Sequence, residues 1–66
     1  MKADRQKMEL AMARACMSTG QISQTARMPH QTVKNVLYGR NVKAYTLGKV
    51  AKALNVDVTE IMETEG

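Results

Sequence analysis

The chain has 66 residues and a formal net charge of +4, which suits one small domain, and we expect no appended sensor domain. Hydrophobic residues make up 44% of the chain and two tyrosines are its only aromatic residues, so we expect an aliphatic, methionine-containing core in an all-helical fold. Because Cys16 and His30 each occur once, an internal disulfide is excluded and a zinc site within one chain is not expected.

No set of residues that carries enzymatic chemistry is visible. There is no glycine-rich phosphate loop with its lysine and no pair of acids beside a base. No apolar run reaches the roughly 18 residues of a membrane span, and residues 1–7 lead into no signal-like hydrophobic stretch. We therefore expect a soluble cytoplasmic protein that is not an enzyme and has no cofactor, metal or small-molecule substrate.

The charges are separated along the chain. Residues 10–56 contain no acid, while four of the six acids lie in the last ten residues. The acid-free span holds seven basic residues: Arg14, Arg27, Lys34, Arg40, Lys43, Lys49 and Lys52. Such a span is either a solvated face of a basic protein or a surface that binds a polyanion, and its overlap with the helical pattern of residues 17–40 favours the second interpretation.

Two helices are predicted before residue 27. Asp4 can cap a first helix that runs to about Cys16, with an apolar face at Met8, Ala11, Met12 and Ala15. A second helix should begin at Thr19, because Ser18 and Gln21 have the spacing of a capping box, in which each side chain bonds to the other's backbone. The apolar face of this helix is formed by Ile22 and Ala26.

A tight turn and a polar helix follow. The turn is predicted at Arg27–Met28, because Pro29 disfavours the helical conformation of the residue before it. The third helix runs from about His30 to Tyr38, Gly39 supplies the left-handed residue that commonly ends a helix, and the inward stripe is Val33, Val36 and Leu37. The opposite face is polar without an acid, which suits a helix that reads DNA bases.

The remaining residues predict a loop and two more helices. Residues 40–45 carry two cations, an amide and a phenol and should form a loop into a fourth helix, whose apolar stripe is Ala44, Leu47, Val50, Ala51 and Leu54. Asn55 can end that helix in a left-handed conformation. Asp57 and Glu60 then restart a short helix, before a polar tail at residues 63–66, with apolar residues at Val58, Ile61 and Met62.

Residues 17–40 resemble the helix-turn-helix of Cro and lambda-repressor-type proteins, also called the xenobiotic-response-element family. The places of that pattern are held by Met17, Ser18, Gln21, Arg27–Met28, the run from His30 to Tyr38, and Gly39–Arg40. Residues 50–62 are similar to the family's fourth and fifth helices, so the resemblance covers about residues 8–62. It implies a compact all-α bundle of about five short helices, with residues 1–66 as a single domain whose core spans about residues 4–62.

The resemblance also implies a function. We expect sequence-specific binding to double-stranded DNA by a small repressor-like transcriptional regulator of a bacterium, its phage or a mobile element. The alternative is a protein-interaction module, such as an antitoxin or assembly domain, that uses the same fold without reading DNA. A homodimer on DNA is expected, because family proteins commonly place two recognition helices about 34 Å apart in successive major grooves. The candidate dimer surface, which could equally close the core, is Val58, Ile61 and Met62.

The chain departs from the family pattern at four positions. Arg27 stands where the family usually has glycine, so we expect a left-handed arginine at a cost of roughly 1 kcal/mol. Pro29 replaces the usual serine or threonine cap. Met12 and Leu37 stand where many members have an Arg–Glu pair, and a packed apolar contact is a sensible substitute for a buried ion pair.

The predicted base contacts lie on the outer face of the third helix and are His30, Gln31, Lys34 and Asn35. The Gln31 amide can both donate to and accept from adenine, while Lys34 suits guanine. A phosphate is expected before the second helix, where Gly20 lets it approach free backbone N–H groups. The predicted phosphate contacts are Ser18, Thr19, Gln21, Arg27, Thr32, Tyr38, Arg40, Asn41 and Lys43.

Overall fold

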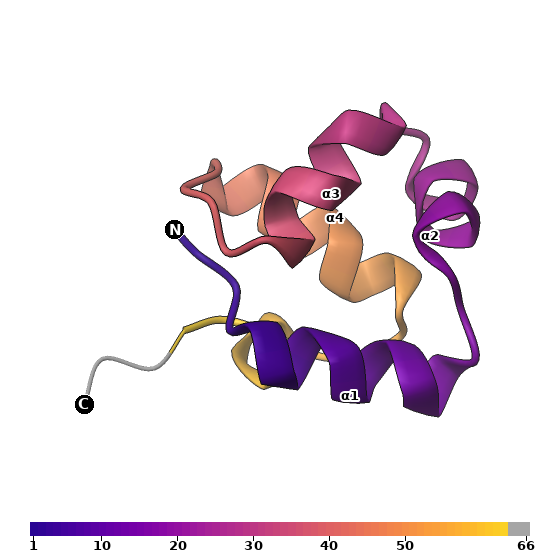
Figure 1. The fold of residues 1–66 in the computed structure, drawn as a ribbon, viewed down its shortest axis with the longest axis horizontal. Helices are drawn as coiled ribbons and strands as arrows, with labels where there is room; N and C mark the ends of the chain where they lie inside the picture. The colour runs from indigo at the N-terminus through magenta and orange to yellow at the C-terminus, as the bar shows by residue number, and fades with distance from the viewer. Residues whose placement is uncertain (64–66) are drawn as a thin grey trace.

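A computed structural model describes residues 1–63, and over that range the protein is helical with no strand. Its elements are α1 (Arg5–Ala15), α2 (Thr19–Ala26), α3 (His30–Leu37), α4 (Ala44–Ala53) and the 3-10 turn η1 (Val58–Glu60). They form a bundle with α1 along one edge and α3 along the opposite edge (Figure 1). No helix within residues 1–63 has the length and apolar character needed to cross a membrane. Residues 64–66 of the predicted tail lie outside the described residues.

The first two helices begin where their capping residues predict. The Asp4 carboxylate accepts from the backbone N–H of Lys7 at 3.0 Å, which starts α1. The Ser18 hydroxyl accepts from the backbone N–H of Gln21 at 3.3 Å, and the Gln21 side-chain oxygen accepts from the backbone N–H of Ser18 at 2.8 Å. The predicted capping box is therefore confirmed. Pro29 stands at the N-cap of α3 and gives no side-chain hydrogen bond.

All four α-helices end in the same closed turn around a left-handed residue. The left-handed residues have φ between 54° and 74° and are Cys16, Arg27, Gly39 and Asn55. At each end, the N–H of the left-handed residue and the next N–H donate to two carbonyls of the last helical turn, the Schellman arrangement. The left-handed conformations predicted for Arg27, Gly39 and Asn55 are confirmed. Arg27 and Cys16 have a side chain in this region, which costs roughly 1–2 kcal/mol per residue.

The core is one cluster of aliphatic and methionine side chains. Its largest fully buried members come from all four helices and the C-terminal turn: Met8, Ile22, Val33, Val36, Leu47, Val50 and Ile61. The helix α2 packs against α3 and α4, and α1 packs against α3 and η1. Met12 and Leu37 are half-buried and both pack against the cluster, so both residues serve the core.

Two sequence predictions were wrong at the C-terminal half. Ala44 and Tyr45 belong to α4 instead of the loop before it, and Ala44 is exposed, so it lies outside the buried stripe. The bundle has four α-helices, not about five, because the predicted last helix is a single 3-10 turn. After that turn Ile61 leaves the helical conformation, with φ −124° and ψ −15°, and Met62 pairs with Ala3 in an isolated antiparallel bridge.

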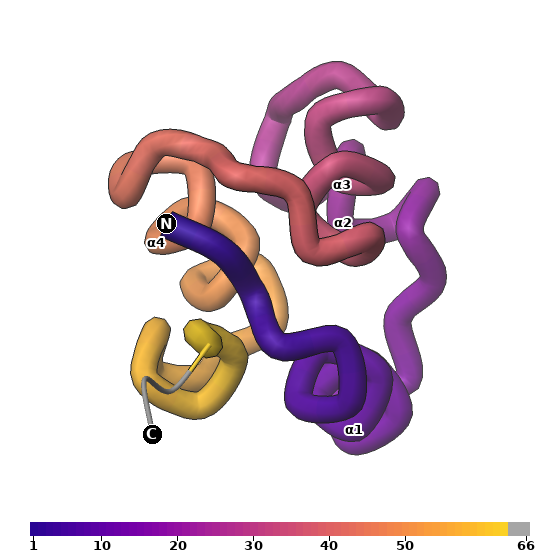
Figure 2. The backbone as a smooth tube through the Cα atoms, turned by 60° about the vertical axis from the view of Figure 1, so that its left-hand side comes forward, coloured from indigo at the N-terminus to yellow at the C-terminus, as the bar shows by residue number. Residues whose placement is uncertain are grey.

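The N-terminal segment, residues 1–4, runs between the α3–α4 loop and the C-terminal turn (Figure 2). The backbone N–H of Val42 donates to the carbonyl of Met1 at 2.7 Å, and the N–H of Asp4 donates to the carbonyl of Ile61 at 2.8 Å. Ala3 between them is buried. The segment therefore links the loop that follows α3 to the last turn of the chain.

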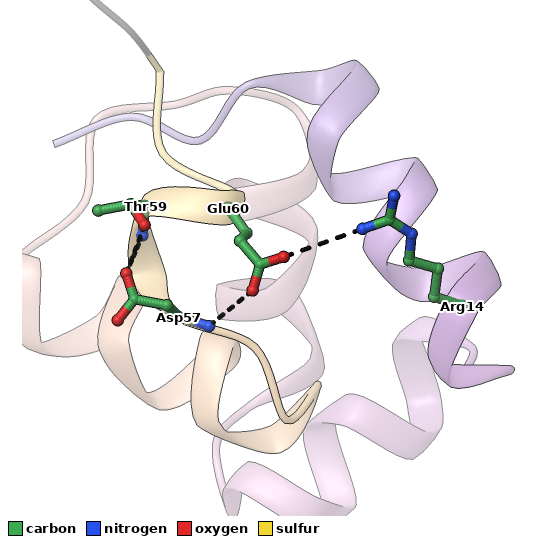
Figure 3. A network of polar contacts seen from close by, with 4 residues as sticks. All are labelled: Arg14, Asp57, Thr59 and Glu60. Carbon is green, nitrogen blue, oxygen red and sulfur yellow. Dashed lines mark hydrogen bonds and ion pairs between the residues drawn. The ribbon is translucent and has the colours of Figure 1, made fainter.

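Side chains hold the C-terminal turn against α1 (Figure 3). Glu60 accepts from the backbone N–H of Asp57 at 3.1 Å, and its carboxylate lies 3.8 Å from the guanidinium of Arg14. Hydrogen bonds from the hydroxyl and the backbone N–H of Thr59 hold the pKa of the exposed Asp57 carboxyl below its ordinary value. The acids of this turn thus engage α1 and their own backbone.

The turn also closes the core. Ile61 is fully buried, while Val58 and Met62 are half-buried against the same cluster. Of the three residues predicted for either the core or a dimer surface, Ile61 therefore serves the core of its own protomer.

Replacing Ile61 by alanine should destabilise the protein by about 2–5 kcal/mol, because the change opens a cavity in a small core. In a domain of this size even 2 kcal/mol corresponds to a fall of about 10 °C in melting temperature, measurable by circular dichroism. Val58→Ala is the matched control and should cost about 1 kcal/mol or less, since Val58 is only half-buried. Equal melting temperatures for the two variants would contradict a larger contribution of Ile61 than of Val58 to the stability of the core.

Candidate nucleic-acid interface

The helix α3 has one face in the core and one toward solvent. Val33 and Val36 are fully buried, as predicted. Of the predicted base contacts, His30 and Gln31 are exposed, and Lys34 and Asn35 are half-buried. All four side chains therefore lie on the part of α3 that the core leaves uncovered, although they are not equally accessible.

The starts of α2 and α3 are joined by a side-chain hydrogen bond. The Nε2 atom of His30 lies 3.0 Å from the hydroxyl oxygen of Thr19. Both are the first residues of their helices, so the bond brings a predicted base contact together with a predicted phosphate contact. An imidazole can donate or accept there, and either tautomer leaves its other ring nitrogen for a further partner.

Asn35 connects two other predicted contacts, Gln31 and Arg40, through its side chain. Its side-chain oxygen accepts from Nε2 of Gln31 at 3.1 Å and from a guanidinium nitrogen of Arg40 at 3.4 Å. These bonds join two predicted base contacts to a predicted phosphate contact in the loop that follows the helix.

The front of α2 leaves room for an anion. Part of the hydrogen-bonding capacity of Ser18 and Gln21 is used in the capping box, but the Ser18 hydroxyl hydrogen and the Gln21 NH₂ group are still donors. A side chain added at Gly20 would meet only the Ser18 hydroxyl oxygen, at 3.8 Å. The packing of the protein therefore does not require glycine at that position.

The remaining predicted contacts lie in or beside the turns at the two ends of α3. Arg27 is exposed in the turn before the helix, and Thr32 is half-buried in its first turn. After the helix, the exposed residues are Tyr38, Arg40, Asn41 and Lys43. The Asn41 side-chain oxygen accepts from the amino group of Met1 at 2.7 Å, so the N-terminal segment holds this loop by a side chain as well as by backbone.

Most cations of the acid-free span have no acidic partner. Within residues 1–63 the ion pairs join Arg5 to Glu9 and Arg14 to Glu60. The same residues give no carboxylate partner to Arg27, Lys34, Arg40, Lys43, Lys49 or Lys52. Of these six, Lys34 lies on α3, and the segments before and after this helix hold Arg27, Arg40 and Lys43, so positive charge without a carboxylate partner among residues 1–63 surrounds α3.

One further candidate for a DNA contact, Tyr45, was not among the contacts predicted from the sequence. Tyr45 is 74% exposed in the first turn of α4, and the ammonium of Lys49 lies 5.5 Å from the centre of its ring. The sequence carried a signal for it, because this tyrosine follows Lys43 by two residues in the polar segment after the third predicted helix.

No family model, curated protein or solved structure matches the chain. Residues 1–63 contain no group of three or more His, Cys, Asp or Glu side chains that could hold a metal ion.

The left-handed conformation of Arg27 leads to a stability prediction at this surface. Arg27→Gly should be more stable than Arg27→Ala by about 1 kcal/mol, because only glycine adopts φ 56° without a Cβ clash. Gly39→Ala is the matched reverse change at φ 74° and should lose about as much. Urea denaturation measures all three variants, and an Arg27→Ala protein as stable as Arg27→Gly would contradict the strained turn.

Proposed function

We propose that the protein binds double-stranded DNA sequence-specifically as a transcriptional regulator, with α2 and α3 acting as a helix-turn-helix of the Cro and lambda-repressor type. One observation carries the proposal: the outer face of α3 is polar and acid-free, and the cations at both of its ends have no acidic partner among residues 1–63. Duplex DNA has the complementary chemistry, because its base edges lie in a groove bordered by phosphates.

In the proposed complex α3 lies in the major groove. Gln31 contacts adenine and Lys34 contacts guanine, because these side chains match the hydrogen-bond groups of those bases. His30, at the first residue of α3, lies deepest in the groove. The surrounding phosphates are held by the start of α2 and the turns at the ends of α3, with the contacts Ser18, Thr19, Gln21, Arg27, Thr32, Tyr38, Arg40, Asn41 and Lys43.

We place this activity in the cytoplasm and expect it to be repressor-like. Cys16, the single cysteine of the chain, is exposed as a free thiol, which is in keeping with a reducing compartment. A small protein that covers an operator acts by occupying it, because no catalytic group is needed for that effect.

Base reading and phosphate binding should respond differently to mutation. Gln31→Ala should weaken binding to the preferred duplex by about 1–3 kcal/mol and relax one base position. Lys43→Ala should weaken all duplexes by a similar factor and lower the salt slope by about one, because it removes one phosphate contact. Fluorescence anisotropy with preferred and scrambled duplexes at several salt concentrations measures both effects. Unchanged affinities of the Gln31→Ala protein for both duplexes would remove α3 as the reader.

The same titrations separate DNA binding from the alternative of a protein-interaction module. If the proposal holds, the logarithm of the affinity for duplex DNA falls linearly with the logarithm of the salt concentration, as counterions are released from phosphates. Because any basic protein can bind DNA non-specifically at low salt, the deciding result is preference: a module that recognises only protein partners binds the preferred and scrambled duplexes with equal affinity.

We further propose that two protomers bind one operator, since one recognition helix covers only a few base pairs. With Ile61 in the core, the surface left for a second copy near the C-terminal turn comprises Val58, Met62 and an open groove of about 510 Å³ between α4 and η1. Sedimentation of the protein with a duplex that carries the preferred site should give two protomers per duplex. One protomer per duplex at saturation would defeat the dimer.

A further inference from the structure

The Asn35 side chain is the meeting point of a small hydrogen-bond network on the outer face of α3. Its oxygen accepts one bond from the Gln31 amide, at 3.1 Å, and one from the Arg40 guanidinium, at 3.4 Å. A carbonyl oxygen has two lone pairs, so both acceptor sites of this amide are used within the protein.

The backbone fixes the partners of Asn35. Gln31 precedes it by four residues and therefore lies on the same helical face, one turn away. Arg40 is placed by the closed turn that ends α3: its backbone N–H donates to the carbonyl of Asn35 at 3.0 Å, and the N–H of Gly39 donates to the carbonyl of Val36 at 3.1 Å. Gly39 permits this turn with φ 74°. The Arg40 guanidinium is thus held close to Asn35 by both main chain and side chain.

The network orients the Gln31 amide but uses only part of its hydrogen-bonding capacity. The NH₂ group has two hydrogens and gives one to Asn35, so one N–H and the carbonyl oxygen of Gln31 remain for a ligand. That donor and that acceptor are the pair needed for bidentate contact with adenine. With its nitrogen directed to Asn35, the amide has one of its two flipped orientations selected before DNA arrives.

We propose that Asn35 is a positioning residue that sets the orientation of Gln31 and couples it to Arg40, in place of the direct base contact that the sequence pattern predicts. The inference rests on the proposed function. In this proposal Asn35 touches no base but influences which base Gln31 prefers at one position. It also links this preference to Arg40, a proposed phosphate contact in the loop after α3. A direct contact from the Asn35 oxygen to a donor on DNA would displace at least one of the two bonds that this oxygen already accepts in the free protein.

Three single variants at two positions, together with the double variant Gln31→Ala/Asn35→Leu, test this assignment. Asn35→Leu keeps the approximate shape and removes the acceptor; Asn35→Asp keeps the acceptor and adds a charge; Gln31→Ala removes the proposed reader. Each variant is made in the full chain. Its affinity is then measured for duplexes in which every base pair of the preferred site is changed in turn. That site comes from selection on a random duplex pool.

Asn35→Leu should lower discrimination at the same base pair as Gln31→Ala, by about fivefold or more, because an unoriented amide reads its base less well. Adding Gln31→Ala to Asn35→Leu should then change that discrimination little, since coupled residues are not additive. Asn35→Asp should keep the base preference while binding every duplex more weakly by a similar factor, because its carboxylate faces phosphates.

Other results overturn the proposal. Loss of discrimination at a base pair different from that of Gln31 would make Asn35 a direct reader, as would a new preferred base in Asn35→Asp. Unchanged discrimination in Asn35→Leu would make the network inert.

A measurement without DNA distinguishes failure of this inference from failure of the proposed function. In the free protein the side-chain NH₂ signals of Gln31 should shift in the NMR spectrum of Asn35→Leu and remain closer to the parent in Asn35→Asp. If these signals respond as expected but the parent protein has no duplex preference, the network stands and the proposed function falls. Gln31 signals that are identical in all three proteins would overturn the network itself.

Discussion

Burial of Val33 and Val36 is the constraint on which the candidate interface depends. These two side chains are fully buried and hold α3 against the core formed with Ile22, Leu47 and Ile61. A helix fixed along one face cannot rotate without exposing apolar surface, so its opposite face is fixed as well. The polar side chains of α3 are therefore presented in one orientation by the packing of apolar ones.

The ends of the helices do as much as their faces to arrange the surface. The turn at Arg27 places α3 directly after α2, and the bond between Thr19 and His30 joins the starts of the two helices. The turn at Gly39 brings Arg40 back beside Asn35. Arg27 has a left-handed backbone and an exposed cationic side chain in the turn between the two helices.

Local patterns predicted most of the helical architecture, and tertiary contacts explain what they missed. The cap at Asp4 and the capping box at Ser18 depend on residues three apart, so the sequence is sufficient to locate them. Residues 57–62 form one 3-10 turn instead of the expected fifth helix, and Met62 then pairs with Ala3, a contact between distant parts of the chain that local patterns do not contain. The Thr19–His30 bond likewise depends on how two helices pack, which periodicity along one helix does not contain.

A map of backbone amide shifts can test whether the outer face of α3 contacts DNA. Isotope-labelled protein is titrated with a duplex obtained by selection from a random pool, and the shift of each amide signal is followed by NMR. If α3 binds in the groove, the largest changes fall in α3, at the start of α2 and in residues 40–43, with little change in α1 or η1. Largest changes in α1 and η1, with α3 unaffected, would contradict binding by α3.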